Sequence, residues 1–278
     1  MAGIWPGETQ CVITLGFDID GVSSWIGRDP ALADKPGLMS LAEYGPKRGV
    51  PRILRMLDDY DIKASFYVPG YVAETHEDMV RELVRRGHEV AHHGYMHEPL
   101  GHMEIEKETE ILEKAIAILE RITGEKPKGY RTPQFDSSTN TLALLASHGF
   151  VYDTSMHDDD VPYIHQIEGR RLVEIPVKWV LDDFGYFAFV PSADVKSAMQ
   201  DPDSVFQVYA AEFEGAYRYG GVMTMTLHPQ VSGRPSRLSA LERLIKYARS
   251  HPNVAFMRGI DIAEYWLSRT GGPSTSSG

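Results

Sequence analysis

The sequence predicts an α/β protein whose parallel strands, each followed by a helix, form a closed or nearly closed β/α barrel. Short apolar runs typical of buried strands alternate with amphipathic helical stretches along the chain. Roughly seven or eight such units occur, which favours a barrel over an open sheet. Because no internal repeat or linker divides the chain, we expect one domain over residues 1–269.

The first half of the chain contains the clearest units. Its first strand is rich in Val, Ile, Leu and Phe and ends in two aspartates, and a loop punctuated by Gly and Pro follows it through Gly45 and Pro46. The helices carry apolar residues at helical spacing, and the second of them stops at Gly87. The predicted strands are 11–20, 63–70, 88–94 and 128–133, and the predicted helices are 50–61, 76–88, 104–124 and 139–149.

The second half continues the alternation. The predicted strands are 149–155, 172–181, 220–229 and 253–259, and the predicted helices are 203–220 and 237–251. Residues 270–278 end in GGPSTSSG, a small and polar stretch. We interpret them as a disordered tail or an expression scar and exclude them from the fold.

Composition and charge narrow the possible functions. The chain has 278 residues, of which 42% are hydrophobic and 24% charged, so it can build a sizeable core. A formal net charge of −11 disfavours nucleic acid as a partner, because binding there depends on Lys and Arg contacts with phosphates. Small-molecule or carbohydrate substrates fit better.

The single cysteine and the lengths of the apolar runs indicate the cellular compartment of the protein. Cys11 excludes an intrachain disulfide, and its apolar surroundings favour a buried, inert thiol. The start MAGIWPGETQ has no signal-peptide pattern, and no apolar run is long enough to span a bilayer. We therefore expect a cytoplasmic protein without a membrane partner.

The strongest local motif is HHGYMH, which follows a predicted strand. His93 and His97 are four residues apart and could point to one side of a helical turn, a spacing that suits two imidazoles on one ion. A pair of surface or turn histidines is the alternative. The neighbouring His92 and His88 leave the choice of ligands open.

The second motif is GFDID, at the end of the first strand. Asp18 and Asp20 are two apart, so their side chains share one face near the end of the strand where barrel enzymes gather catalytic groups. Two carboxylates so close would repel each other unless a cation neutralised one of them. A turn carboxylate before Gly21 is the alternative for Asp20.

Two further strand ends carry candidate catalytic groups. TLHP puts His228 at the end of an apolar strand, and YRTPQF puts Arg131 at a corresponding place. Either residue alone could be structural. However, these residues and those of the first two motifs all fall at strand ends or in the loops after them, so one barrel mouth can hold them together.

Taken together, the four motifs resemble the polysaccharide deacetylase (NodB-homology) family, also called carbohydrate esterase family four. The resemblance implies a distorted β/α barrel and a divalent ion, Zn²⁺ by preference. The ligands that it implies are Asp20, His93 and His97. It also implies Asp18 as the general base, Arg131 as the residue that holds this base, and His228 as the acid.

The first motif departs from the usual family pattern. The family has adjacent aspartates, whereas Ile19 separates them here. The phrases FDIDGV, PVKWVLDD and TLHPQVSGRP resemble a narrower subgroup that holds intracellular peptidoglycan-deacetylase-like proteins and cyclic imide hydrolases. This narrower resemblance points away from a polymeric substrate and implies a homo-oligomer.

The expected activity is hydrolysis of a non-peptide C–N bond in an N-acetylated sugar or a small cyclic amide or imide. The metal would activate water and polarise the carbonyl, and a backbone N–H near Tyr130 or Arg131 would help to hold the oxyanion. The alternatives are a metal-independent amidohydrolase resembling allantoinases and a catalytically silent saccharide-binding protein.

Several polar and aromatic residues are candidates for supporting roles. His228 needs a carboxylate to orient it. The candidates for this carboxylate are Asp159, Asp160, Asp182 and Asp183. The strand-end position favours Asp182 and Asp183, whereas a solvated acidic loop is the favoured alternative for HDDDVPY, which holds the other two. Trp179 is a candidate for the substrate wall, with plain core packing as the alternative.

Overall fold

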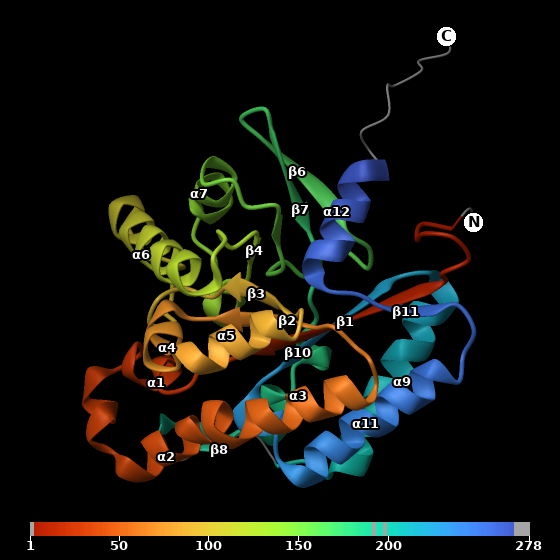
Figure 1. Cartoon of the computed structure of the whole chain (residues 1–278), viewed down its shortest axis with the longest axis horizontal. Coiled ribbons are helices and arrows are strands. Elements are labelled where there is room, and N and C mark those ends of the chain that lie inside the picture. Colours follow the sequence, from red (N-terminus) through yellow and green to blue (C-terminus); the bar gives the residue numbers. More distant parts are fainter. Residues whose placement is uncertain (1–2, 191–192, 197–198, 270–278) are drawn as a thin grey trace.

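A computed structural model describes residues 3–190, 193–196 and 199–269 of the chain. It shows a curved sheet of nine strands with helices on its outside (Figure 1), as the sequence predicted. The predicted tail, 270–278, lies outside the described residues. The strands are β1 (Cys11–Asp18), β2 (Ser65–Val68), β3 (Glu89–His92), β4 (Gly129–Tyr130), β5 (Tyr152–Asp153), β6 (Tyr163–Ile167), β7 (Arg170–Glu174), β10 (Val222–Leu227) and β11 (Val254–Phe256), and β8 (Phe189–Val190) and β9 (Val195–Lys196) form a separate hairpin.

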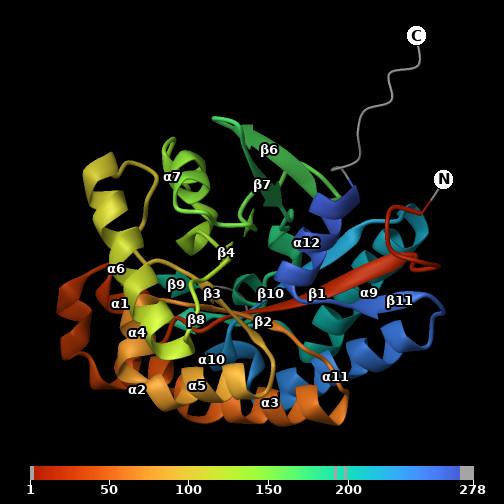
Figure 2. The same ribbon diagram turned by 45° about the horizontal axis from the view of Figure 1, so that its top comes forward.

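The sheet is parallel except at one edge. Its order is β10-β1-β2-β3-β4-β5-β7-β6, with β11 also paired to β1, and only β6 runs antiparallel to its neighbour. The two ends of the sheet are joined by the segment after β7. Ile175 N donates to Asp153 O at 2.9 Å, and Asp182 forms a parallel bridge with Thr226 of β10. The result is a distorted barrel, visible from a second side in Figure 2.

The helices pack their apolar faces against the outside of this sheet. A core of buried aliphatic and aromatic side chains lies between β1, β2 and β10 and the helices α3, α5, α9 and α11. Helices α6 and α9 end at Gly124 and Gly220, whose φ angles of 87° and 85° suit a glycine cap. The longer helices are α2 (Pro36–Tyr44), α3 (Val50–Asp59), α5 (Glu77–Arg85), α6 (Ile105–Thr123), α7 (Thr141–Ser147), α9 (Pro202–Tyr219), α11 (Pro235–Arg249) and α12 (Gly259–Arg269).

Short helices fill the connections between these elements. They are α1 (Ser23–Ile26), α4 (Gly70–Thr75), α8 (Phe184–Phe187) and α10 (Pro229–Ser232), the 3₁₀ helices η1 (Pro30–Asp34), η3 (Pro133–Phe135) and η4 (Trp179–Leu181), and the π-helix η2 (Gly45–Gly49). Among the described residues, no helix combines the length and the apolar composition needed to cross a bilayer.

Several stretches differ from the prediction, which missed helices α4 and α12 and the strands β8 and β9. The expected loop through Gly45 and Pro46 is largely helical, because it contains α1, η1, α2 and η2. The strand predicted for 172–181 ends at Glu174, and it forms a hairpin with β6, which the sequence analysis missed. Its turn residues Glu168 and Gly169 have φ angles of 50° and 77°, as a tight two-residue hairpin turn requires.

Candidate active site

The three predicted metal ligands lie together at the C-terminal ends of β1 and β3. Asp20 Oδ1 is 3.6 Å from His93 Nε2 and 3.8 Å from His97 Nε2. The two histidines do not lie on a helical turn, as had been considered. Instead, Gly94 and His97 have φ angles of 72° and 58°, and this tight bend brings His97 back beside His93.

Unpartnered atoms test whether this cluster fits a cation. Asp20 Oδ1 and His93 Nε2 are buried and have no hydrogen-bond partner among the described residues. His93 Nδ1 donates to Arg131 O at 2.8 Å, so the lone pair of this ring lies on Nε2 and faces Asp20. A buried polar atom without a partner is costly, and a divalent ion about 2.0–2.2 Å from each ligand would satisfy all of them. The donor set therefore fits a zinc-type ion.

The protonation states also suit metal binding. Burial lowers the pKa of His97 to about 4, which keeps its imidazole neutral at pH 7. Burial by itself would raise the pKa of Asp20, but the attraction of His97, His93 and His228 lowers it overall. An ionised carboxylate and neutral imidazoles are the forms that bind a divalent ion.

Asp18 and Arg131 form a buried ion pair beside these ligands. Arg131 Nη1 donates to Asp18 Oδ1 at 2.6 Å, and Asp18 Oδ2 lies 3.8 Å from His93 Nε2. Both side chains are at least 96% buried. Although burial opposes the charge on Arg131, the carboxylate of Asp18 raises the pKa of this guanidinium. The arginine therefore fixes one oxygen of Asp18 and leaves the other toward the cluster.

Tyr130 and Arg131 were the residues near which a backbone N–H was expected to hold the oxyanion. The N–H of Arg131 donates to His92 O at 3.0 Å within the sheet. The side chain of Tyr130 packs on His92 and Phe150, away from the cavity described below. The Arg131 N–H and the Tyr130 side chain therefore do not face the cavity, and a backbone N–H near these residues as the oxyanion donor stays a prediction.

His228 follows β10 and has one clear carboxylate partner. Asp183 Oδ1 accepts from His228 Nδ1 at 2.7 Å, and its Oδ2 accepts from the His228 backbone N at 3.0 Å and from Ser232 Oγ. Burial would lower the pKa of His228, but Asp183 raises it well above its usual value. The Nε2 atom of His228 lies 3.7 Å from Asp20 Oδ2, so it faces the cluster.

The other three candidate carboxylates differ in their positions. Asp182 Oδ1 is 3.7 Å from His228 Nδ1 and accepts from Phe184 N, and burial raises its pKa to about 7. Asp159 and Asp160 are exposed and lie in a turn, where Asp160 pairs with Lys178. These two aspartates do not approach His228, so the structure removes them as candidates.

A cavity of about 390 Å³ opens over the cluster. Its walls are aromatic: Trp25, Phe135, Trp179 and Phe184 line it. Trp179 is 60% exposed and stacks on His157 at 5.5 Å, so the core-packing alternative is wrong. The lining residues that the sequence analysis did not name are Ser24, Trp25, Arg28, Thr132, Gln134, Phe135, Asp136, Phe184 and Gly185.

Most of these missed residues lie within a recognised motif or shortly after one. Thr132, Gln134 and Phe135 come after Arg131, and Trp25 lies five residues after Asp20. The loops after barrel strands form the mouth of the barrel, so their side chains could have been predicted as wall residues from position alone.

Comparisons with known proteins agree with this geometry. The polysaccharide deacetylase family model matches residues 34–152, a range that holds His93, His97 and Arg131. A peptidoglycan deacetylase from Helicobacter pylori is 31% identical, and the alignment covers 94% of this chain and 97% of that protein.

Solved structures extend the likeness to the whole fold. A Mycobacterium smegmatis protein assigned as a polysaccharide deacetylase has a TM-score of 0.93 and 38% identity, over 95% of this chain and 93% of that one. The Puue allantoinase has a TM-score of 0.85 and 28% identity, over 96% and 93%. The chain therefore belongs to the polysaccharide deacetylase family, in its NodB-homology barrel form.

Proposed function

We propose that this protein is a metal-dependent hydrolase of non-peptide C–N bonds and that Asp20, His93 and His97 hold its divalent ion. One observation carries the proposal. Three buried metal-ligating side chains meet with unpartnered atoms on Asp20 and His93, between a carboxylate held by Arg131 and an imidazole held by Asp183. The arrangement supplies a metal site, a base and an acid around one cavity.

The roles of the residues follow from their contacts. A bound Zn²⁺ would lower the pKa of water and polarise the substrate carbonyl. Asp18 keeps one oxygen free of Arg131, so it can take a proton from a water held near His93. Because the pair is buried and rigid, the base does not have to be oriented at each turnover.

His228 is positioned to return a proton to the leaving nitrogen. Its Nδ1–H is bound to Asp183, which leaves Nε2 facing Asp20 and the cavity. Asp183 raises the pKa of His228, which favours the protonated form of this ring. An amide nitrogen is a poor leaving group without that proton, so the pair Asp183–His228 supplies what C–N cleavage needs.

The cavity favours a compact substrate that contains a ring. Trp179 and the partly exposed Phe135 and Phe184 offer flat apolar faces on which a sugar or a cyclic amide can stack. Relatives point to both classes, because they include a peptidoglycan deacetylase and an allantoinase. We therefore propose an N-acetylated sugar or a small cyclic amide or imide as substrate.

Metal analysis combined with a substrate panel tests the proposal. The purified protein should contain about one equivalent of a divalent ion per chain, lose turnover on chelation and regain it with Zn²⁺. The panel compares N-acetylated chitooligosaccharides with succinimide, hydantoin and allantoin. Absence of turnover on every member by a metal-loaded sample would overturn the proposal.

Two alternatives give different outcomes in the same experiment. The likeness to an allantoinase favours a metal-independent amidohydrolase, whose turnover would survive chelation. A silent binding protein would retain a ligand without product, and Asp18→Asn would leave that binding intact. Since base, acid and ligand residues meet in one cavity, we rank both below the metal enzyme.

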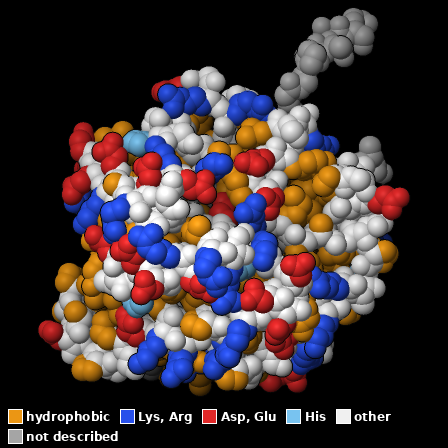
Figure 3. All heavy atoms as spheres, in the orientation of Figure 1, with side chains coloured by type: hydrophobic (Ala, Val, Ile, Leu, Met, Phe, Trp, Pro, Cys, Tyr) orange, Lys and Arg blue, Asp and Glu red, His pale blue; other side chains and the backbone are white. Residues whose placement is uncertain are grey.

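The remaining proposals concern assembly and location. On the face shown in Figure 3, acidic and basic side chains are interspersed, which suits a small substrate better than a polyanion. We propose that residues 1–269 act as one domain in a cytoplasmic homo-oligomer. Light scattering after gel filtration tests the assembly, and limited proteolysis tests the domain.

A further inference from the structure

A column of buried side chains runs through the barrel interior beneath the proposed base. It starts at Arg131, whose guanidinium carbon lies 4.0 Å from the ring centroid of Tyr67. The hydroxyl of Tyr67 is 3.2 Å from that of Tyr152, which donates to Glu89 Oε1 at 3.0 Å. All four side chains belong to residues at most 9% exposed, so water does not screen these contacts.

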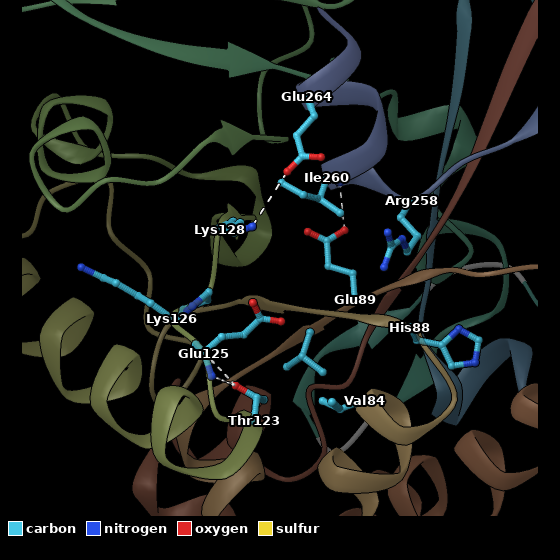
Figure 4. Close-up of a pocket in the computed structure, with 12 residues that line it drawn as sticks. Val84, His88, Glu89, Thr123, Glu125, Lys126, Lys128, Arg258, Ile260 and Glu264 are labelled. Atoms are coloured by element: carbon cyan, nitrogen blue, oxygen red, sulfur yellow. Dashed lines mark hydrogen bonds and ion pairs between the residues drawn. The ribbon is translucent and has the colours of Figure 1, made fainter. Parts of the chain in front are cut away.

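The lower end of the column is firmly hydrogen-bonded. Glu89 Oε2 accepts from Ser65 Oγ at 2.5 Å and from Ile260 N at 3.1 Å. Figure 4 shows this end from a cavity of about 230 Å³, with the Ile260–Glu89 bond drawn as a dashed line. Glu89 thus fixes the hydroxyl of Tyr152 against the first turn of α12.

The hydrogen bonds of the column have one direction. Tyr152 has a single hydroxyl proton, and it goes to Glu89, so Tyr67 must donate to Tyr152. Each bond polarises the next and draws negative charge toward the oxygen of Tyr67. A more electron-rich ring attracts the guanidinium of Arg131 more strongly.

Arg131 needs this support because its burial is incompletely compensated. Its Nη1 is bound to Asp18, but its Nη2 has no hydrogen-bond partner among the described residues. A buried cation is costly unless other groups stabilise it. The ring of Tyr67 supplies an attraction on the face of the guanidinium, where no hydrogen bond can form.

Three glycines make room for the column. A Cβ on Gly16 would lie 2.9 Å from both Nη atoms of Arg131. A Cβ on Gly129 would lie 2.2 Å from the ring of Tyr152, and one on Gly259 would lie 2.4 Å from its hydroxyl oxygen. These glycines come from β1, β4 and α12, so three separate elements leave the same space free.

We propose that Tyr67, Tyr152 and Glu89 are positioning residues, which hold the guanidinium of Arg131 and through it the carboxylate of Asp18 in the orientation that proton abstraction requires. The proposal rests on the proposed function, because it assigns these side chains to the same reaction. None of the three touches the substrate cavity. They therefore act on the rate of the chemical step and leave substrate binding alone.

The first experiment compares Tyr67→Leu with Tyr67→Phe. Tyr67→Leu removes the ring and should lower kcat about tenfold or more, with KM and bound metal unchanged. Tyr67→Phe keeps the ring and should stay within about threefold of the wild type. The matched control is Phe66→Leu, because Phe66 lies on the opposite face of β2 against Phe17. It should lower thermal stability and leave the kcat of the folded protein unchanged.

If Tyr67→Leu does not fold, a second variant tests the proposed positioning role. Tyr152→Phe keeps the packing between Gly129 and Gly259 and removes the hydroxyl that accepts from Tyr67 and donates to Glu89. It should lower kcat about threefold at unchanged KM, since the polarisation of the ring is lost. Wild-type kcat in Tyr152→Phe, or in a folded Tyr67→Leu, would overturn the proposal.

A readout without substrate separates this inference from the proposed function. Hydrogen exchange of the Arg131 Nε–H, followed by NMR, reports whether the guanidinium is held. It should be slow in the wild type and in Tyr67→Phe and clearly faster in Tyr67→Leu. Equal exchange in all three would overturn the column even in an active enzyme, whereas slow exchange in a wild type without turnover would refute the function alone.

Discussion

Both ends of the barrel interior contain a buried carboxylate, but Glu89 and Asp20 differ in how far their oxygens are hydrogen-bonded. At the end near β11, both oxygens of Glu89 accept hydrogen bonds. At the end near α1, Asp20 Oδ1 and the neighbouring His93 Nε2 have no partner among the described residues. The first end is a fully hydrogen-bonded network that stabilises the fold. The second is a set of metal-ligating atoms without partners, which a bound cation would satisfy.

This comparison shows how a carboxylate suited to bind a ligand can be distinguished from a structural carboxylate in the same buried interior. Burial alone does not mark function, because Glu89 and Asp20 are both at most 9% exposed. What differs is whether the surrounding donors satisfy the charge. A structural carboxylate should stabilise the fold, whereas a ligand carboxylate should contribute little stability until its ion is bound.

The largest expected effect is on activity, at the unsatisfied end. Asp20→Asn should lower kcat/KM by about a thousandfold or more and abolish metal binding, because it removes the anionic member of the proposed ligand set. In the metal-free protein it should cost less unfolding free energy than Glu89→Ala, because only the attraction of His97, His93 and His228 for its charge is lost. Kinetics, metal analysis and urea denaturation measure the three quantities. A marked loss of stability in the metal-free variant would break the comparison.

The next effect concerns the acid. Asp183→Asn should lower kcat about tenfold to a hundredfold, because the orienting partner of His228 loses its charge. Asp159→Asn is the control, since that exposed side chain bonds only within its own turn. It should show wild-type kcat. If the two variants behaved alike, Asp183 would not be the residue that orients the acid.

At the satisfied end the main effect is on stability. Glu89→Ala leaves Ser65 Oγ, Tyr152 Oη and Ile260 N without an acceptor, which should cost about 3 kcal/mol of unfolding free energy. Urea denaturation at pH 7 measures this loss. A change below about 0.5 kcal/mol would mean that water replaces the lost contacts and that this end is not a fully hydrogen-bonded network.

Asp153 sharpens the comparison, because its Oδ2 is also buried and unpartnered but lies away from the cavity. Burial and the nearby Glu174 raise its pKa well above the usual value, so folding favours the protonated carboxyl. Unfolding then releases this proton, and wild-type stability falls as pH rises above the unfolded pKa of about 4. Asp153→Asn should therefore gain stability relative to the wild type between pH 4 and 8, as measured by melting temperature. A constant difference across this range would contradict the bound proton.

Much of the fold and of the metal site could be predicted from the sequence, for one geometric reason. In a parallel barrel, all strands end on the same side, so polar residues at the ends of apolar runs must meet there. Asp18, Asp20, His93, Arg131 and His228 satisfy this condition, and the structure brings them together. The regular strands from β1 to β5 follow from the same alternation of apolar runs and amphipathic helices.

What could not be predicted depends on non-local packing. The pairing of Asp182 with Thr226 closes the barrel across more than forty positions of sequence, and neither residue signals it locally. The same bridge turns Asp183 toward His228 and decides between Asp182 and Asp183, the strand-end pair that the sequence favoured without separating its two members. By contrast, the hairpin turn at Glu168–Gly169 has a local signal that the sequence analysis overlooked.

The central place of β1 has a consequence for how the chain is made. This first strand pairs with β2, but also with β10 and β11, whose residues lie more than 200 positions later. During synthesis the other edge of β1 therefore cannot pair until nearly the whole polypeptide has left the ribosome. Contacts between such distant segments slow folding. Nascent chains of this protein should thus depend on chaperones for longer than a helical bundle of the same length.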